Sequence, residues 1–341
     1  MILQDLSDKI INIDLGNTYL YFVTRSLKPD LKKATKAMDK FIYKIYQIDV
    51  NDEIRTHLYD LTISQLAYLD KSKTELHEYE VITDDSEQLF TYSMVNKATA
   101  FSDILNNQLK NNPPKIKSLE EIILEEELWA YCVGFNFTGN EWIYTFRKLL
   151  SSKVAISEKD GNKHSGIQKT LRTIFNSKSE KLELIEGETV NLDKQIDCVF
   201  YEDVFYIAKK QQFEQIIGLE EEFKTLATQV VDQLKATDMI DGLDLIVKQI
   251  DANPSIHKKL VRLSKIGNYN KLDKNTIEEM GKVCLAREGR SLKIENDRLV
   301  LENEKDIDLL LRMLCDYYKI GEISGKPYGT FAGRELAVLT Q

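Results

Sequence analysis

Short apolar runs joined by very short connections fill much of the chain up to about residue 210, and this spacing constrains the fold most. The runs are rich in β-branched and aromatic residues, which favour strands. WAYCVGFNF and EWIYTFRKLL, for example, are joined only by Thr138, Gly139 and Asn140, which is a hairpin signal. Connections of a few residues are too short for a parallel crossover, so the sequence predicts an antiparallel sheet.

The N-terminal part mixes predicted strands with a predicted helix. IINIDL (10–15) and TYLYFVT (18–24) read as a hairpin, and FIYKIYQIDV (41–50) reads as a further strand. Residues 86–110 read as a helix that NNPP (111–114) ends, because proline cannot continue a helix. We therefore place a domain boundary there, which leaves residues 1–114 as an N-terminal α/β region.

The remainder, residues 115–341, is expected to form one α+β domain. KLELIEGETV, QIDCVFY and VFYIAKK extend the antiparallel sheet, which we expect over about 127–210. From 211 to 341 the apolar spacing changes to three and four, which predicts helices. The predicted elements of this helical part include helices over 254–266, 274–287 and 306–318, and a hairpin within RSLKIENDRLVLEN. The fold class is thus α+β, with a central antiparallel sheet, an N-terminal α/β part and a helical C-terminal part.

Composition narrows the functional class. The formal net charge of −9 argues against a protein that coats nucleic acid over its whole surface, although local basic patches remain possible. Cys132, Cys198, Cys284 and Cys315 form no CxxC pair, which favours buried free thiols over a disulfide framework or a zinc site. Neither a signal peptide nor an apolar run of about 20 residues is present. These features predict a cytoplasmic protein without metal or cofactor.

The segment NLDKQIDCVFYEDVFYIAKKQQFEQIIG (191–218) raises the possibility of a metal-dependent nuclease. Such a core places an acid two residues before a lysine on the second strand, so that carboxylates bind metal and the lysine polarises water. Here Lys209 and Lys210 have apolar residues in that position, and the acids at 202–203 lie at a predicted turn. We therefore predict no enzyme activity, and keep a nuclease using Asp197 and Glu188 as a rival hypothesis.

Basic residues form the most specific functional signal. SIHKKLVRLSKIGNYNK carries Lys258, Lys259, Arg262, Lys265 and Lys271 and no acid. On the predicted helix, three of these cations share one face by the i, i+4, i+7 rule, while apolar residues share another. A row of cations of this kind can contact successive phosphates and gain from counterion release. The alternative is an ordinary solvated helix face, where most lysines lie.

A second basic stretch surrounds the loop EKDGNKHSG. Its candidate residues for nucleic-acid binding are Arg147, Lys148, Lys163, Lys169 and Arg172. A glycine-containing loop with cations could follow a phosphate backbone, and the alternative is a plain surface loop.

Three segments taken in order resemble the KwaB-like family of the Kiwa anti-phage system. They are DKQIDCVFYEDVFYIAKKQQFEQIIG, NPSIHKKLVRLSKIGNY and LLLRMLCDYYKIGEISGKPYG. The resemblance covers about residues 180–335 well and the N-terminal half loosely. Because these segments are fold signatures, they carry no catalytic or DNA-contacting motif that can be transferred residue by residue.

The resemblance implies a bacterial protein that works with KwaA, a small integral membrane protein that senses phage attack. It also implies DNA binding, association as dimers or higher homo-oligomers, and a block of phage DNA replication or late gene expression. Recruitment to the inner face of the membrane would then come through the partner. Besides the nuclease, one further rival remains, namely a non-catalytic assembly protein whose acidic face docks a membrane partner.

Overall fold

The computed structural model describes residues 2–28, 41–73, 75–83, 88–95, 97, 99, 101–116, 126–137, 141–149, 192 and 195–331, and the backbone alone of 154–159, 162–167, 173–176 and 181–184. The chain forms two compact units. The sheet unit comprises Met1–Leu31, Phe41–His77 and Gln88–Ile217. The helical unit comprises Lys32–Lys40, Glu78–Glu87 and Gly218–Gln341.

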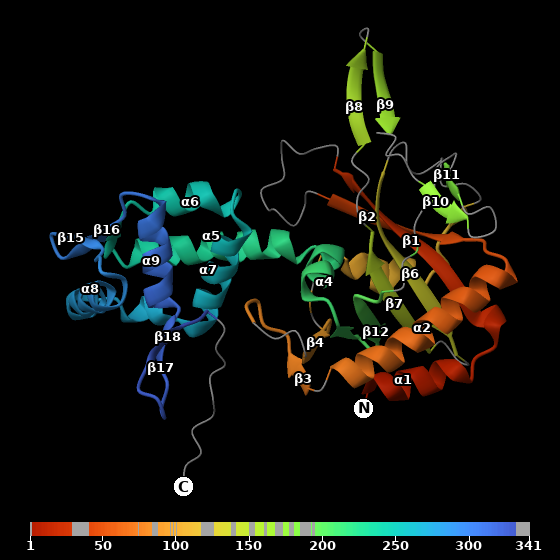
Figure 1. Ribbon diagram of the computed structural model, residues 1–341. Helices are drawn as coiled ribbons and strands as arrows, with labels where there is room; N and C mark the ends of the chain where they lie inside the picture. Colours follow the sequence, from red (N-terminus) through yellow and green to blue (C-terminus); the bar gives the residue numbers. More distant parts are fainter. Residues whose placement is uncertain are drawn as a thin grey trace. The chain divides into compact units, whose positions relative to one another are not determined.

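One large, mostly antiparallel sheet organises the sheet unit (Figure 1). Its strands are β1 (Thr18–Leu27), β2 (Phe41–Ile48), β3 (Glu75–Glu78), β4 (Gln88–Ser93), β5 (Lys115–Ile116), β6 (Glu127–Asn136), β7 (Trp142–Lys148), β12 (Cys198–Tyr201) and β13 (Val204–Ile207). Their order across the sheet is β3-β4-β13-β12-β7-β6-β1-β2-β5. The pairs that join β4 through to β2 are antiparallel, whereas β5 lies parallel to β2.

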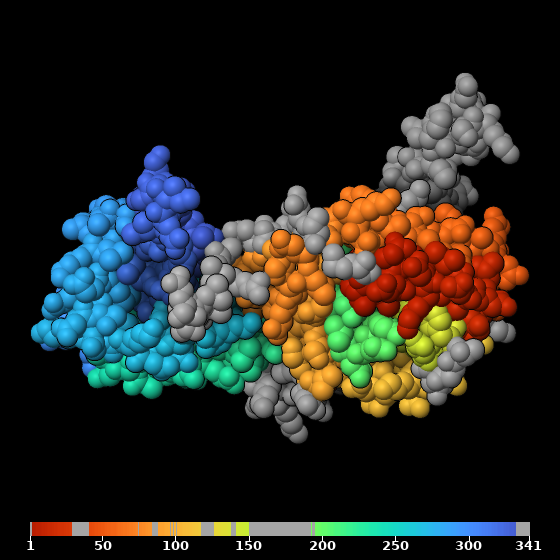
Figure 2. Space-filling model, turned by 90° about the horizontal axis from the view of Figure 1, so that it is seen from below, coloured from red at the N-terminus to blue at the C-terminus, as the bar shows by residue number. Residues whose placement is uncertain are grey.

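Different elements cover the two faces of this sheet because strand side chains alternate between the faces. Helices α1 (Ile2–Ile11) and α2 (Asp52–Ser72) pack on the face that carries Leu20, Phe22 and Val133. In Figure 2 the red surface of α1 adjoins the green surface of β12 and β13, where Lys9 donates a hydrogen bond to Tyr201. On the opposite face, α4 (Lys210–Ile217) places Phe213 against Phe205, with ring centroids 5.2 Å apart.

Two further hairpins belong to the sheet unit. They are β8 (Val154–Lys159) with β9 (Asn162–Ile167), and β10 (Thr173–Asn176) with β11 (Lys181–Leu184), both antiparallel.

The helical unit packs its helices around one apolar core. Its elements are α5 (Leu219–Ala236), β14 (Ile240–Asp241), α6 (Asp244–Ile250), α7 (Pro254–Ile266), η5 (Asn268–Lys271), α8 (Lys274–Glu288), β15 (Lys293–Glu295), β16 (Arg298–Val300), α9 (Glu304–Leu314), β17 (Tyr318–Ile320) and β18 (Pro327–Gly329). The core includes Leu234 of α5, Leu260 and Leu263 of α7, and Leu310 and Leu311 of α9. Strands β14, β16 and β15 form a small sheet, and β17 pairs with β18 in a separate hairpin.

The predicted α+β class and the antiparallel sheet are confirmed. Helices α7 and α8 and the β15–β16 hairpin also lie where the sequence predicts them. The turn at 202–203 is confirmed as well, since both residues have positive φ angles, of 47° and 59°.

Two local predictions in the N-terminal part are wrong. Residues 10–15 form no strand: Ile10 and Ile11 end α1, in which Leu3, Leu6 and Ile10 recur at helical spacing and lie in the core. Residues 88–93, predicted as helix, form strand β4, because pairing with β13 outweighs local preference.

The compact units divide the chain after Ile217, whereas the sequence suggested a boundary after residue 114. Strand β1 lies before residue 114 in the chain and pairs with β6, which lies after it, so one sheet contains strands from both sides of the suggested boundary.

Candidate nucleic-acid interface

Helix α7 presents the basic cluster predicted from sequence, and its ends are set by local signals. The Asn253 side chain accepts a hydrogen bond from the Ser255 amide at 3.0 Å, and Pro254 occupies the first turn. Gly267 ends the helix with φ 71°, a left-handed conformation that glycine adopts without steric cost. The apolar residues between them, Leu260 and Leu263 among them, are buried in the core of the helical unit, which fixes the orientation of the helix.

The cations of α7 that face away from this core form what we call the α7 row: Lys258, Arg262 and Lys265. Lys258 and Arg262 are half-buried, and Lys265 is exposed. Beyond the helix end, exposed Lys271 donates a hydrogen bond to Asn268 at 3.1 Å. The helix body carries no acidic residue, so no carboxylate within α7 neutralises the row.

Lys259 differs from the row, because its amine is held by other parts of the same unit. Its Nζ lies 2.7 Å from the Asp308 carboxylate and 4.3 Å from the Phe331 ring centroid, and its side chain is only 14% exposed. Burial acts to raise the pKa of Asp308, but the hydrogen bond from Lys259 and the nearby Arg312 guanidinium lower it overall. Lys259 therefore supports the packing of α7 on α9.

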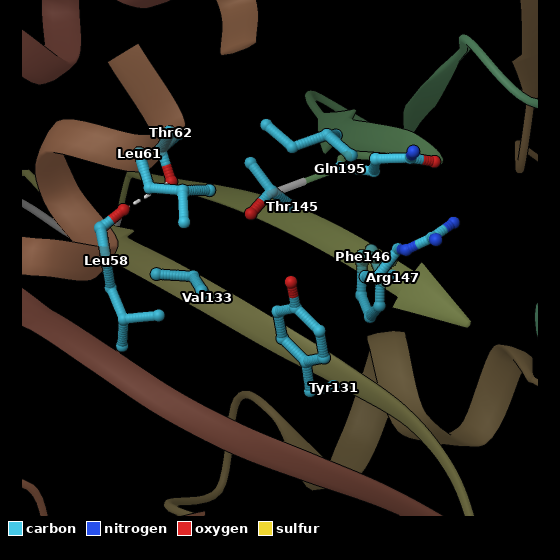
Figure 3. A pocket seen from close by; sticks show the side chains of 10 residues that line it. Leu58, Leu61, Thr62, Tyr131, Val133, Thr145, Phe146, Arg147 and Gln195 are labelled. Carbon is cyan, nitrogen blue, oxygen red and sulfur yellow. Dashed lines mark hydrogen bonds between the residues drawn. The ribbon is translucent and has the colours of Figure 1, made fainter. Parts of the chain in front are cut away.

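Arg147 lies in the sheet unit and pairs with a buried acid. Its Nη1 is 2.5 Å from Asp197 Oδ1, and the Asp197 side chain is fully buried. The second carboxylate oxygen of Asp197 accepts the Lys148 backbone N–H at 2.7 Å. Figure 3 shows Arg147 with Phe146 and Gln195 around a small cavity of about 10 Å³, roughly the room that one water needs.

Lys148 is buried beside an aromatic ring. Its Nζ donates a hydrogen bond to the Leu149 carbonyl at 2.6 Å and lies 3.6 Å from the Trp129 ring centroid. Arg25 stacks on the same ring at 3.2 Å. Burial lowers the pKa of Lys148 to about 8, with Glu127 acting in the opposite direction. Sequence proximity to a loop suggested a surface cation, whereas the structure places this amine inside the sheet unit.

The structure gives no side-chain position for the other residues of the second basic stretch. The backbone of Lys163 lies in β9 and its side chain is not described, and Lys169 and Arg172 lie outside the described residues. Among the described side chains, the predicted basic residues thus fall into separate units, with Arg147 and Lys148 in the sheet unit and those of α7 and η5 in the helical unit.

The acids proposed for the rival nuclease are placed as follows. The Asp197 carboxylate is engaged by Arg147 and the Lys148 amide, and Glu188 lies outside the described residues. In the part of the chain that the structure describes, no three His, Cys, Asp or Glu side chains gather as a potential metal site. The four cysteines are free and buried.

The sequence did not predict that Lys259 contacts Asp308 and Phe331, which distinguishes it from the other cations of α7. Asp308 and Phe331 are far from it in the chain, and only the i, i+4 pair of Asp308 with Arg312 was visible as a local charge pattern.

The fold and this site define an α+β protein in which a capped helix of a C-terminal helical unit displays a short row of cations. The family model described as "Kiwa protein KwaB-like" matches residues 125–324. This match covers more than half of the chain, so the protein belongs to the KwaB-like family of Kiwa proteins. Membership confirms the resemblance inferred from sequence and implies a role in anti-phage defence with a KwaA partner.

The other comparisons add no relative. No curated protein and no solved structure matches the chain. Among the described residues, no helix is both long enough and apolar enough to cross a bilayer.

Proposed function

We propose that this KwaB-like protein binds DNA without sequence specificity through the α7 row and thereby blocks phage DNA replication or late gene expression. It would act as a cytoplasmic homodimer or higher homo-oligomer, without catalysis, at the inner face of the membrane to which its KwaA partner recruits it. Phosphate contacts would supply most of the affinity, because the candidate surface offers cations and no array of base-reading groups.

The observation that supports this proposal is the orientation of α7. Its apolar residues are buried, the row lies on the opposite side of the helix, and Lys265 and Lys271 lie exposed at its C-terminal end. On a chain with net charge −9, a surface of this sign is able to attract a polyanion locally.

The test is charge reversal with a matched control. Lys258→Glu, Arg262→Glu and Lys265→Glu together should abolish a gel shift of duplex DNA at low salt. The control reverses Lys274, Lys282 and Lys293, which changes the net charge equally but at cations already paired with carboxylates at 2.9, 2.6 and 2.7 Å. The control should retain binding. Circular dichroism and thermal unfolding establish that both variants fold.

Because Arg262 is half-buried, a second variant avoids it. Lys265→Glu with Lys271→Glu changes only exposed residues and should weaken binding at least about tenfold near 0.1 M salt, since two phosphate contacts are lost. Undiminished binding by both folded variants would remove the α7 row from consideration as the site.

The rivals give different results in the same assay. Incubating the wild-type protein with plasmid and Mg²⁺ or Mn²⁺ separates a binder, which shifts the DNA, from a nuclease, which degrades it. Absence of any shift at low salt would favour the non-catalytic assembly protein.

A further inference from the structure

The β17–β18 hairpin ends in an apolar side chain that the described residues of its unit leave uncovered. Ile323 is fully exposed at the apex of the turn between the strands, and Ile320 and Tyr328 on the stem are more than half exposed. Figure 1 shows the hairpin extending beyond the helices of its unit. Together these side chains give one hairpin three exposed apolar groups, and grouped apolar exposure of this kind marks interaction sites more often than single exposed residues do.

The turn that carries Ile323 is held by several hydrogen bonds. The Gly325 amide donates to the Gly321 carbonyl at 2.8 Å, and the Gly321 amide donates to the Lys326 carbonyl at 3.0 Å. Ser324 Oγ lies 3.2 Å from the Tyr328 hydroxyl, and a Cβ on Gly321 would lie 2.8 Å from the Tyr328 ring. The Tyr328 ring therefore packs over Gly321, and the apex is preorganised.

The base of the hairpin is anchored by aromatic packing. Tyr317 packs so closely over Gly329 that a Cβ there would lie 2.4 Å from its ring, and the Tyr317 and Phe331 centroids are 4.7 Å apart. Phe331 in turn receives the Lys259 amine of α7. Such support limits bending of the stem under load.

The hairpin also begins beside the C-terminal end of the α7 row. Asn268, which follows α7, donates hydrogen bonds at 3.1 Å to the Leu314 carbonyl and the Asp316 carboxylate, just before β17. The hairpin itself adds two exposed cations, Lys319 and Lys326. Glu322 is the only acidic residue in the segment 317–331. Cations thus lie both at the foot and along the sides of the apolar apex.

We propose that the β17–β18 hairpin is a DNA wedge, in which Ile323 inserts between two base pairs while Lys319 and Lys326 contact the flanking phosphates. This inference rests on the proposed DNA binding and adds that binding deforms the duplex. Two-stranded ribbons enter DNA grooves, and single apolar side chains on such elements unstack one base step and kink the helix by about 20–90°.

The apex favours DNA over a bilayer or a second protein copy. A bilayer surface is bound through a broad apolar face, whereas Glu322 and Ser324 flank the single isoleucine at this tip. A protein interface buries roughly 800 Å² on each partner around a cluster of buried anchors, and the three exposed apolar side chains of this narrow hairpin, Ile320, Ile323 and Tyr328, offer much less area than that. A base step, in contrast, accepts one side chain.

The test measures bending directly. A short duplex with a donor and an acceptor dye at its ends should show increased energy transfer when the wild-type protein binds. Ile323→Ala should abolish this increase and weaken binding roughly threefold to tenfold, whereas Ile323→Leu should restore both. Leu285→Ala, which changes another exposed apolar residue (59% exposed) on α8, serves as the matched control and should behave as wild type.

The outcomes separate this proposal from the one on which it rests. If the wild-type protein shifts DNA and Ile323→Ala bends it equally, the wedge is overturned and the α7 row stands. If the wild-type protein shifts no DNA at low salt, both proposals fail. Sedimentation with vesicles containing anionic lipid, or a change of oligomer mass, that depends on Ile323 would overturn the wedge in favour of a membrane or self-association contact.

Discussion

Two groups of cations in this protein look alike in sequence and differ in the elements that carry them and in what surrounds their side chains. Arg147 and Lys148 lie on a strand of the sheet unit, where one pairs with buried Asp197 and the other lies on the Trp129 ring. Lys258 and Lys265 lie on a helix whose apolar side is buried, and the first is half-buried whereas the second is exposed. Density of basic residues along a chain therefore says little about their availability to a polyanion.

The difference follows from the periodicity of the two elements. On a strand that is covered on both faces, every side chain points into one protein layer or the other, so a cation must find an internal partner. On an amphipathic helix, one stripe is always left to solvent. This difference is why the proposed phosphate contacts are placed on α7 and not on the strands of the large sheet.

The largest effect expected concerns the buried pair. Asp197→Asn would remove the buried carboxylate that pairs with Arg147, a side chain only 13% exposed, and should lower the free energy of unfolding by about 3–5 kcal/mol. Urea denaturation measures this loss. Asp232→Asn on the exposed side of α5 is the control and should change stability by less than about 0.5 kcal/mol. A loss of stability below about 1 kcal/mol for Asp197→Asn would show that the ion pair between Arg147 and Asp197 does not stabilise the sheet unit.

The second effect is the pH dependence that Lys148 imposes. Its pKa is lowered to about 8 in the folded chain, so below that pH both states carry the charge and its burial destabilises the fold. Between about pH 8 and its ordinary pKa of 10.5, the unfolded chain binds more protons, and stability rises by up to about 1.4 kcal/mol for each pH unit.

Lys148→Met removes this titration. The unfolding free energy of the methionine variant minus that of the wild type should be largest at pH 7. This difference should fall by about 1–3 kcal/mol as the pH rises to 10. Unfolding free energies of the two proteins measured across this range check the difference. A constant difference would mean that the amine is solvated in the folded state.

Much of α7 could be predicted because its signals are local. Asn253 and Pro254 mark the start, Gly267 marks the stop, and the apolar spacing orients the helix. The fates of Arg147 and Lys148 could not be predicted in this way, because their contact with Asp197 joins residues about 50 positions apart. Partner identity at that separation depends on strand register, which no short pattern specifies.

Two other features escaped prediction for local reasons. The β-branched residues Ile10, Ile11 and Ile13 suggested a strand, although Leu3, Leu6 and Ile10 have helical spacing. The segment GEISGKPYG has neither period, so no strand or helix was predicted for it. Gly321 and Gly325, two of its three glycines, were the available signal for the turn that holds Ile323.

A smaller effect distinguishes the stability of helix α7 from the DNA affinity of its cations. Asn253→Ala removes the cap of α7 and should cost about 1 kcal/mol of stability, while DNA affinity changes less than about twofold, because the row begins a turn beyond the cap. Asn275→Ala, at an exposed position in the first turn of α8, is the matched control. A large loss of DNA affinity with little loss of stability would instead make Asn253 part of the binding surface.

The smallest effect compares two cations on the same helix, exposed Lys265 and paired Lys259. Lys265→Gln removes an exposed cation and should reduce the slope of log affinity against log salt by about one, and weaken binding by less than about 1 kcal/mol at 0.15 M salt. Lys259→Gln, six residues earlier, should leave the slope unchanged, because Asp308 and Phe331 already hold that amine, and should instead lower stability. Fluorescence anisotropy titrations over a range of salt, with urea denaturation of both variants, measure the two quantities. Equal slopes of log affinity against log salt for the two variants would show that Lys259, which is paired with Asp308, and exposed Lys265 contribute alike to DNA binding, and would contradict the distinction between them.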